Sequence, residues 1–175
     1  RRGDRPDAGR LTAVKRWMVA GAVIEGPDGV LLVANRRHDG AVDWSTPGGV
    51  IDDGEEVLTG LAREVREETG LVVSRWDGLL YGIEVVAPDL GWHLRVEVHR
   101  AEAVEGELVV DDPDGIVIDA GWVAVGECDA RLAQSHPWVR EPLSAWLGQR
   151  WTLARDFRYH VAGTDRSSFT VSALP

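Results

Sequence analysis

The feature that most constrains this chain is the stretch from Gly49 to Leu71, which reads GVIDDGEEVLTGLAREVREETGL. Glu64, Glu67 and Glu68 follow the spacing i, i+3, i+4, which puts three carboxylates on one face of a helix. Like charges at this spacing repel each other and lower stability, so the cluster requires a counter-charge. A divalent cation supplies it most simply, and Mg²⁺ prefers oxygen ligands and bridges to substrate phosphates. A solvated acidic helix face is the alternative interpretation.

The same stretch predicts a helix from about Glu55 to Thr69. At about 100° per residue its apolar positions fall on one arc beside the acidic one, and they are Leu58, Leu61, Ala62, Val65 and Thr69. Gly70 suits the left-handed residue that ends a helix. The preceding loop, Pro47-Gly48-Gly49, can bring a backbone carbonyl close to a metal or a phosphate. We therefore expect one helix face to pack on a sheet and the other to face a cleft.

Position by position, the stretch resembles the motif that defines the Nudix hydrolases. That motif is Gly, five residues, Glu, seven residues, Arg-Glu, an aliphatic residue, any residue, Glu-Glu, any residue, Gly and an aliphatic residue. The matching residues here are Gly49, Glu55, Arg63, Glu64, Val65, Glu67, Glu68, Gly70 and Leu71. So many restricted positions at fixed spacing make the resemblance specific. Outside the motif it extends only to the order of strands and helices.

The resemblance implies an α/β fold, namely a Nudix-type α/β/α sandwich with a mixed sheet. It also implies hydrolysis of a diphosphate linkage that depends on Mg²⁺, with Mn²⁺ as a substitute. Glu64, Glu67, Glu68 and the carbonyl of Gly49 would bind the metal. Arg63 and Glu55 would hold a glutamate of the motif in position, so the expected catalytic set is Glu64, Glu67, Arg63 and Glu55. For Arg63, a surface ion pair with Glu67 is the alternative.

Family members cleave nucleoside diphosphates linked to another group, including nucleoside triphosphates, damaged nucleotides, dinucleoside polyphosphates and ADP-ribose. We expect a nucleoside diphosphate derivative or a nucleoside triphosphate as the substrate here, without naming one, and an ADP-ribose-like or damaged nucleotide stays open. The net charge of −10 argues against long nucleic acids, which bind positive surfaces. A small phosphorylated ligand needs only a local positive site, which a bound cation provides.

Four residues are candidates for substrate binding. Arg36 and Arg37 follow an apolar run and lead toward the glycine loop, where a guanidinium can contact phosphate. Trp44 and Trp92 lie at positions suited to stacking on a base. For the arginines, simple solvation at the surface is the alternative. Trp17, Trp122 and Trp146 lie inside apolar patterns and are expected in the core.

The general base is left open by the sequence. It is either a glutamate of the motif or an acid from a separate loop. Many relatives carry a Glu pair several residues before the tryptophan that corresponds to Trp122, whereas this chain has Asp112, Asp114 and Asp119 there. Aspartate is shorter by one methylene, and catalytic geometry tolerates little misplacement. Ordinary turn formation by these acids is the alternative.

Outside the motif, apolar runs bounded by turn residues predict further strands and one more helix. Trp17 to Ile24 and Val30 to Ala34 flank Gly26-Pro27-Asp28-Gly29 and predict a hairpin of buried strands. The other predicted elements are one or two strands in Val72–Val86, strands in His93–Val104 and Ile116–Val125, and a helix over Trp138–Leu147. No repeated βαβ unit is visible, which argues against a doubly wound fold.

The chain divides into three predicted parts. Residues 1–12 are expected to form a flexible lead-in, residues 13–148 a Nudix hydrolase domain, and residues 149–175 a tail. Within the tail, Phe157–Val161 and Ser168–Val171 predict a hairpin around Gly163-Thr164-Asp165. An isolated hairpin is marginal in water, so this one must dock, either on its own domain or in a homodimer.

Two further observations bear on class and location. Cys128 is the single cysteine, which excludes an internal disulfide and favours a reducing, cytoplasmic setting. No run of about 18 apolar residues and no signal-peptide pattern is present, so no membrane association is expected.

Two other functional classes share the predicted fold. A non-catalytic Nudix module that binds or regulates is one alternative, but such modules typically lose acids of the motif and none is missing here. An isopentenyl diphosphate isomerase is the other, and it needs a catalytic cysteine. Cys128 follows the last expected core strand, which disfavours that interpretation.

Overall fold

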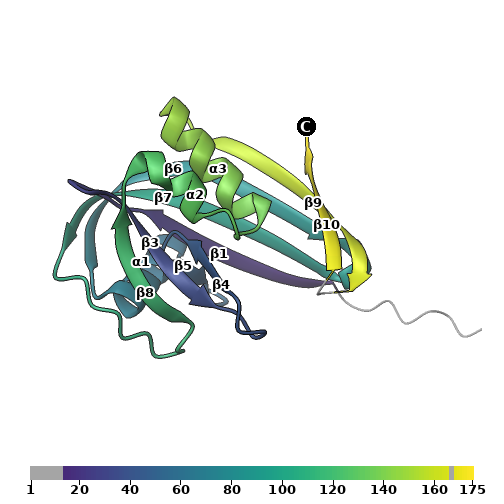
Figure 1. The fold of residues 1–175 in the computed structure, drawn as a ribbon, viewed down its shortest axis with the longest axis horizontal. Coiled ribbons are helices and arrows are strands. Elements are labelled where there is room, and N and C mark those ends of the chain that lie inside the picture. The colour runs from purple at the N-terminus through teal and green to yellow at the C-terminus, as the bar shows by residue number, and fades with distance from the viewer. Residues whose placement is uncertain (1–13, 166–167) are drawn as a thin grey trace, which may run out of the picture.

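The protein is described by a computed structural model that covers residues 14–165 and 168–175. The predicted flexible lead-in, residues 1–12, lies outside these described residues. Two β-sheets occupy the middle of the molecule, with helix α1 on one side and helices α2 and α3 on the other (Figure 1). The predicted α/β/α sandwich with a mixed sheet is confirmed.

The larger sheet is mixed and has six strands in the order β10-β9-β6-β7-β1-β5. Pairs β1–β7 and β6–β9 are parallel and the others are antiparallel. The strands are β1 (Lys15–Val23), β5 (Gly48–Val50), β6 (Val72–Ala87), β7 (Trp92–Glu105), β9 (Arg155–Asp165) and β10 (Ser168–Leu174). The predicted region Val72–Val86 is thus one strand, whose pairing with β7 shifts register several times between Val73 and Tyr81.

The smaller sheet is antiparallel and is organised around β3 (Gly29–Arg36). Strands β2 (Glu25–Gly26), β4 (Val42–Ser45) and β8 (Val117–Val123) all pair with β3. The predicted hairpin between Trp17–Ile24 and Val30–Ala34 is wrong, because β1 belongs to the larger sheet and β3 turns back only onto the short β2. Both runs are buried along most of their length, so their periodicity carries no information about the partner strand.

The helices follow the predicted order. They are α1 (Val57–Thr69), α2 (Cys128–Arg131) and α3 (Pro137–Gln149), with short 3₁₀ turns η1 (Pro88–Leu90) and η2 (Val125–Glu127). Helix α3 confirms the predicted Trp138–Leu147 helix and buries Trp138, Leu143, Trp146 and Leu147. Helix α1 ends as predicted at Gly70, which has φ 74°. It begins at Val57 rather than Glu55, because the backbone of Glu56 is extended, with φ −69° and ψ 139°.

The C-terminal residues extend the larger sheet. Strands β9 and β10 form an antiparallel hairpin, and β9 also pairs in parallel with β6. Tyr159 and Val161 of β9 lie in the same core cluster as Val85 of β6 and Leu143 of α3. The hairpin therefore docks on its own chain. A homodimer stays a prediction, but an undocked tail no longer supports it.

Helix α1 packs on the larger sheet through Leu61 and Val65, which are both 0% exposed. They form a core cluster with residues of β1 that include Ala20 and Ala22. Leu58, predicted on the same buried arc, is 37% exposed instead. It lies in the first turn of the helix.

Replacing Leu61 with alanine should lower the free energy of unfolding by about 2–5 kcal/mol, because a fully buried side chain leaves a cavity under the acidic helix. Chemical denaturation measures the change. Leu58→Ala is the matched control in the same helix, and its effect should stay under about 1 kcal/mol. Equal losses in the two variants would contradict this packing.

Candidate active site

The acidic face of α1 is organised by one arginine. Arg63 Nη2 lies 3.1 Å from Glu55 Oε2, and Arg63 Nη1 lies 2.7 Å from Glu64 Oε1 and 3.3 Å from Glu67 Oε2. The hydrogen bonds that Arg63 donates to Glu55 and Glu64 raise the pKa of Arg63 above its usual value. The same arginine lowers the pKa of Glu55. Arg63 therefore does more than form the surface pair with Glu67, because one guanidinium holds three carboxylates.

Glu68 takes a different partner, in the glycine loop. Its carboxylate is buried, with the residue 8% exposed, and its Oε2 accepts a 2.8 Å hydrogen bond from the Gly48 N–H. A Cβ atom at Gly49 would lie 2.4 Å from Glu64 Oε2, and one at Gly48 would lie 2.1 Å from the Ala20 carbonyl. Gly48 therefore requires glycine, because the clash there is with backbone and its φ is 146°, whereas a side chain at Gly49 would force the Glu64 carboxylate to move.

Burial and mutual repulsion perturb these carboxyl groups. The pKa of Glu68 is raised to about 8, chiefly by burial, while the Gly48 N–H opposes the shift and the charges of Glu64, Asp112 and Glu67 add to it. The pKa of Glu64 is also raised by burial, against the opposing effect of Arg63. Glu67 and Asp114 contribute further repulsion at Glu64. The cluster thus lacks sufficient positive charge, and a bound cation would remove the repulsion.

The donor set of this cluster fits a hard divalent cation, because it consists of carboxylate oxygens and nearby backbone carbonyls. Within residues 14–165 and 168–175, however, no three Asp, Glu, His or Cys side chains converge as metal ligands. The reason is local: Glu64 and Glu67 turn toward Arg63, and Glu68 turns toward Gly48. The glutamates are gathered on one helix face, and metal binding would require some of them to turn.

A loop between β7 and β8 brings further acids to the same face. The Val109 N–H bonds to the Thr69 carbonyl at 2.9 Å, which fixes the loop against the end of α1. The Asp112 carboxylate accepts hydrogen bonds from the backbone N–H groups of Asp114, Ile116 and Val117, so it organises the loop as a turn former. Asp114 is exposed and acts electrostatically on Glu64. Asp119 is part of β8 and accepts from the Ala120 N–H.

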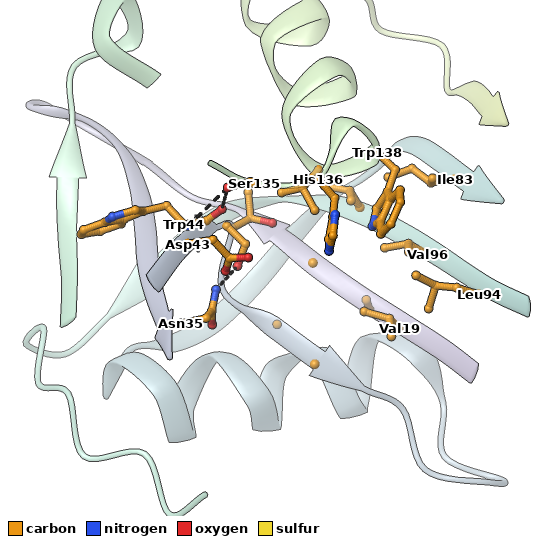
Figure 2. Close-up of a pocket in the computed structure, with 18 of the residues that line it drawn as sticks. Val19, Asn35, Asp43, Trp44, Ile83, Leu94, Val96, Ser135, His136 and Trp138 are labelled. Carbon is orange, nitrogen blue, oxygen red and sulfur yellow. Dashed lines mark hydrogen bonds between the residues drawn. The ribbon is translucent and has the colours of Figure 1, made fainter. Parts of the chain in front are cut away.

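A cavity of about 470 Å³ opens beside Gly48 and Gly49, which line it. Figure 2 shows its two ends. Asn35, Asp43 and Ser135 form a polar end, and the opposite end is apolar and includes Ile83, Leu94, Val96 and Trp138. His136 lies between the ends and stacks on Trp138 with ring centroids 4.2 Å apart. Pockets of this size and polarity are typical of small-ligand sites.

Asp43 is a polar residue of this cavity that the sequence analysis missed. It is 7% exposed, and its Oδ2 accepts a 2.6 Å hydrogen bond from Arg37 Nε as well as one from Arg37 Nη2. The signal available in the sequence was an aspartate inside the short run Val42–Ser45 just before the glycine loop. That signal alone does not distinguish a buried acid from an exposed one.

The four predicted substrate-binding residues lie in different places. Arg37 lines the cavity, and Arg36 is exposed at the end of β3. The Trp44 ring points away from the cavity (Figure 2), and the guanidinium of Arg131 lies 4.7 Å from its centroid. Trp92 lines a neighbouring pocket of about 270 Å³ that shares Leu94, His136 and Trp138 with the cavity.

Two of the remaining predictions can be compared with the structure. Trp17 is not a core residue but lines the pocket that contains Trp92. Cys128 is buried in the core at the start of α2, 1% exposed, and burial raises the pKa of its thiol. A buried thiol of this kind is a poor nucleophile, which disfavours the isomerase alternative. None of the described helices is long and apolar enough to cross a membrane.

Comparison with known proteins gives a consistent picture. The NUDIX domain family model matches residues 15–147. The "Putative mutator protein MutT4" of Mycobacterium tuberculosis is 30% identical over 75% of this chain, and the chain spans 55% of that protein's length. The "Putative 8-oxo-dGTP diphosphatase 2" of the same organism is 31% identical over 61% of this chain and 84% of its own.

Comparison with a solved structure agrees with the family match. The crystal structure of a MutT NUDIX hydrolase from Burkholderia pseudomallei has a TM-score of 0.61 and 30% sequence identity. The match covers 74% of this chain and 96% of that one.

The perturbed pKa of Glu68 predicts how the stability of the metal-free protein depends on pH. The carboxyl group titrates near 4.5 in the unfolded chain and at about 8 in the folded one. Its stabilising contribution is therefore complete below pH 4.5 and is lost as the pH rises to about 8. The slope over this window is at most about 1.4 kcal/mol per pH unit.

Glu68→Gln should flatten this part of the pH profile and be more stable than the wild type at pH 8, as measured by denaturation in excess chelator. Glu56→Gln, at an exposed position just before the helix, is the matched control and should follow the wild-type profile. Parallel profiles for wild type and Glu68→Gln would contradict the perturbed pKa.

Proposed function

The chain belongs to the Nudix hydrolase family, and on this premise we propose that it hydrolyses a diphosphate linkage in a nucleoside diphosphate derivative or nucleoside triphosphate, with Mg²⁺ as metal ion. One observation carries the proposal: the glycine loop that touches Glu64 and Glu68 also lines the large cavity. A single substrate can therefore place its phosphates at the acidic helix face and its base in the cavity. Such an arrangement requires a small nucleotide rather than a long nucleic acid.

We assign the metal site to Glu64, Glu67, Glu68 and the carbonyl of Gly49. A bound divalent cation polarises phosphoryl oxygens and lowers the pKa of water. The residues around this site have separate tasks. Arg63 and Glu55 position Glu64 and Glu67, and the Gly48 N–H positions Glu68. Release of the three glutamates from these partners would let their carboxylates converge on a metal ion.

We further propose that Asp114 takes the proton from the attacking water. Asp112 is unsuited to this role because its carboxylate accepts three backbone hydrogen bonds of the loop. Asp114 is exposed at the edge of the acidic face and lies close enough to Glu64 to raise its pKa. A carboxylate beside the metal ligands that does not itself bind the metal is free to accept a proton from water.

The names of the relatives favour a nucleoside triphosphate among the candidate substrates, because one is called an 8-oxo-dGTP diphosphatase and another a mutator protein. A damaged nucleotide or an ADP-ribose-like substrate fits the same cavity. A non-catalytic nucleotide-binding module is the second candidate function, and turnover distinguishes the two. We keep the cytoplasmic location as a proposal.

Activity should require Mg²⁺ or Mn²⁺ and disappear in excess chelator, because the acidic face needs a cation to accept a phosphate. Glu67→Gln should lower kcat/KM by about a hundredfold or more. The measurement is phosphate or pyrophosphate release from a panel of nucleoside triphosphates and ADP-ribose, together with Mn²⁺ affinity by calorimetry. Glu56→Gln serves as the control. Full turnover in chelator would refute metal dependence, and no turnover of any panel member would favour the binding module.

Asp114→Asn should lower kcat by about a hundredfold or more and leave KM and thermal stability nearly unchanged. Asp112→Asn should instead lower stability, because three loop hydrogen bonds lose a charged acceptor. Both variants are compared by steady-state kinetics and thermal denaturation. An Asp114→Asn enzyme that keeps the wild-type kcat would rule out this base.

A further inference from the structure

A second pocket, of about 270 Å³, adjoins the cavity and is built mainly from aromatic side chains. Three of the chain's eight tryptophans line it, namely Trp17, Trp92 and Trp138, and Phe169 of the C-terminal hairpin joins them. Trp17, Trp92 and Phe169 are only partly buried, so these large rings keep some contact with water. Aromatic side chains around a concave space are typical of sites that bind small ligands.

Strand pairing determines where this second pocket lies relative to the glycine loop. Side chains two residues apart share one face of a strand, so Gly21, Val19 and Trp17 of β1 follow one another on the same face. Gly21 pairs with Gly48 and lines the cavity, whereas Trp17 lines the second pocket. At about 3.3 Å per residue, Trp17 is about 13 Å from Gly21. The second pocket is therefore far from the phosphate end of the site.

Strand β7 gives the same order. Val96 and Leu94 line the cavity, while Leu94 and Trp92 line the second pocket. Figure 2 shows Leu94 and Trp138 at the end of the cavity farthest from Asn35. Leu94 and Trp138 line both spaces, so the cavity and the second pocket meet at these two side chains.

The lining of the second pocket favours a neutral flat ring. Its described residues are aromatic side chains and leucines, and none carries a carboxylate. Burial and the charge of Arg37 lower the pKa of His136, the titratable group of this lining, so its imidazole is neutral at pH 7. Lys15 Nζ already lies 4.6 Å from the centroid of the Trp17 ring, so a cationic ligand would meet a like charge. An uncharged aromatic ring meets no such penalty and packs well against other rings.

We propose that the second pocket receives an aromatic ring attached to the base of the substrate, so that the enzyme accepts nucleotides whose base carries an aryl substituent. The inference rests on the proposed function and names a substrate class for the same site. With the phosphates at the glycine loop and the base in the cavity, the far edge of the base reaches Leu94 and Trp138. A ring attached at that edge enters the second pocket. Phe169, which lines this pocket, lies outside the residues 15–147 that the family model matches.

The first test compares AMP with N6-benzyl-AMP, and dGMP with O6-benzyl-dGMP, on the wild-type chain. Binding is followed by tryptophan fluorescence, since three tryptophans line the second pocket. In at least one pair the benzyl nucleotide should bind about 10-fold more tightly or better, which is the gain from burying an apolar ring of this size. Equal or weaker binding of the benzyl nucleotide in both pairs, or no binding of any of the four nucleotides, would overturn the proposal.

The second test uses variants of the pocket wall. Phe169→Leu and Trp17→Leu each replace a ring with a smaller apolar side chain and should reduce the benzyl preference about threefold or more. The affinity for the unmodified nucleotide should change less than about twofold. Phe157→Leu, in β9 of the same hairpin, lines neither space and is the matched control that should keep the preference. A preference that neither pocket variant reduces would refute this pocket as the binding site of the ring.

Nuclear magnetic resonance of the wild-type complex locates the ring without any substitution. Intermolecular nuclear Overhauser effects should connect the benzyl protons with the indole protons of Trp17 or Trp92. Contacts of the benzyl ring with other side chains only would overturn the proposal.

The triphosphates of the same pairs separate this inference from the proposed function. Metal-dependent hydrolysis of ATP or dGTP, with no benzyl preference in binding or in kcat/KM, refutes only the role of the second pocket. A benzyl preference that the pocket variants reduce, without turnover of any triphosphate, refutes only hydrolysis. A preference in both binding and kcat/KM that the pocket variants reduce supports both.

Discussion

The arrangement of this molecule depends on how the acidic face of α1 is neutralised. Arg63 contacts Glu55, Glu64 and Glu67, and Glu68 is left to the backbone of the glycine loop. This division removes part of the repulsion that carboxylates at helical spacing impose. It also ties the helix to the loop, because Glu68 accepts a hydrogen bond from the Gly48 N–H. Stability and the candidate site therefore depend on the same contacts.

The two sheets turn this local arrangement into a site with two parts. Strand β5 pairs with β1 in the larger sheet, so the loop that touches the acids also borders the space between the sheets. Strand β4, from the smaller sheet, brings Asp43 to that space, and α3 covers it with Trp138. Strand β5 (Gly48–Val50) thus joins the acidic helix face and the cavity.

The helix and its acids could be predicted because spacing alone determines which residues share a helix face. The exception is Leu58, which lies in the first turn and is exposed although it shares the apolar arc. Strand partners could not be predicted, since the buried runs of β1 and β3 look alike in sequence although they belong to different sheets. Asp43 was also missed, because its burial and its pairing with Arg37 depend on how the chain folds and not on the local pattern. Local patterns thus predicted the acidic half of the site but not the polar end of the cavity.

The central claim is that the acidic helix face and the cavity bind one ligand together. It is tested most directly by nuclear magnetic resonance of the labelled chain with a nucleoside monophosphate, first with Mg²⁺ and then with a trace of Mn²⁺. The account predicts shifts at Asp43, His136 and Trp138 on adding the nucleotide, and paramagnetic broadening centred on Gly49 and Glu68 on adding Mn²⁺. Nucleotide shifts confined to other surfaces, or broadening away from α1 and the glycine loop, would contradict it.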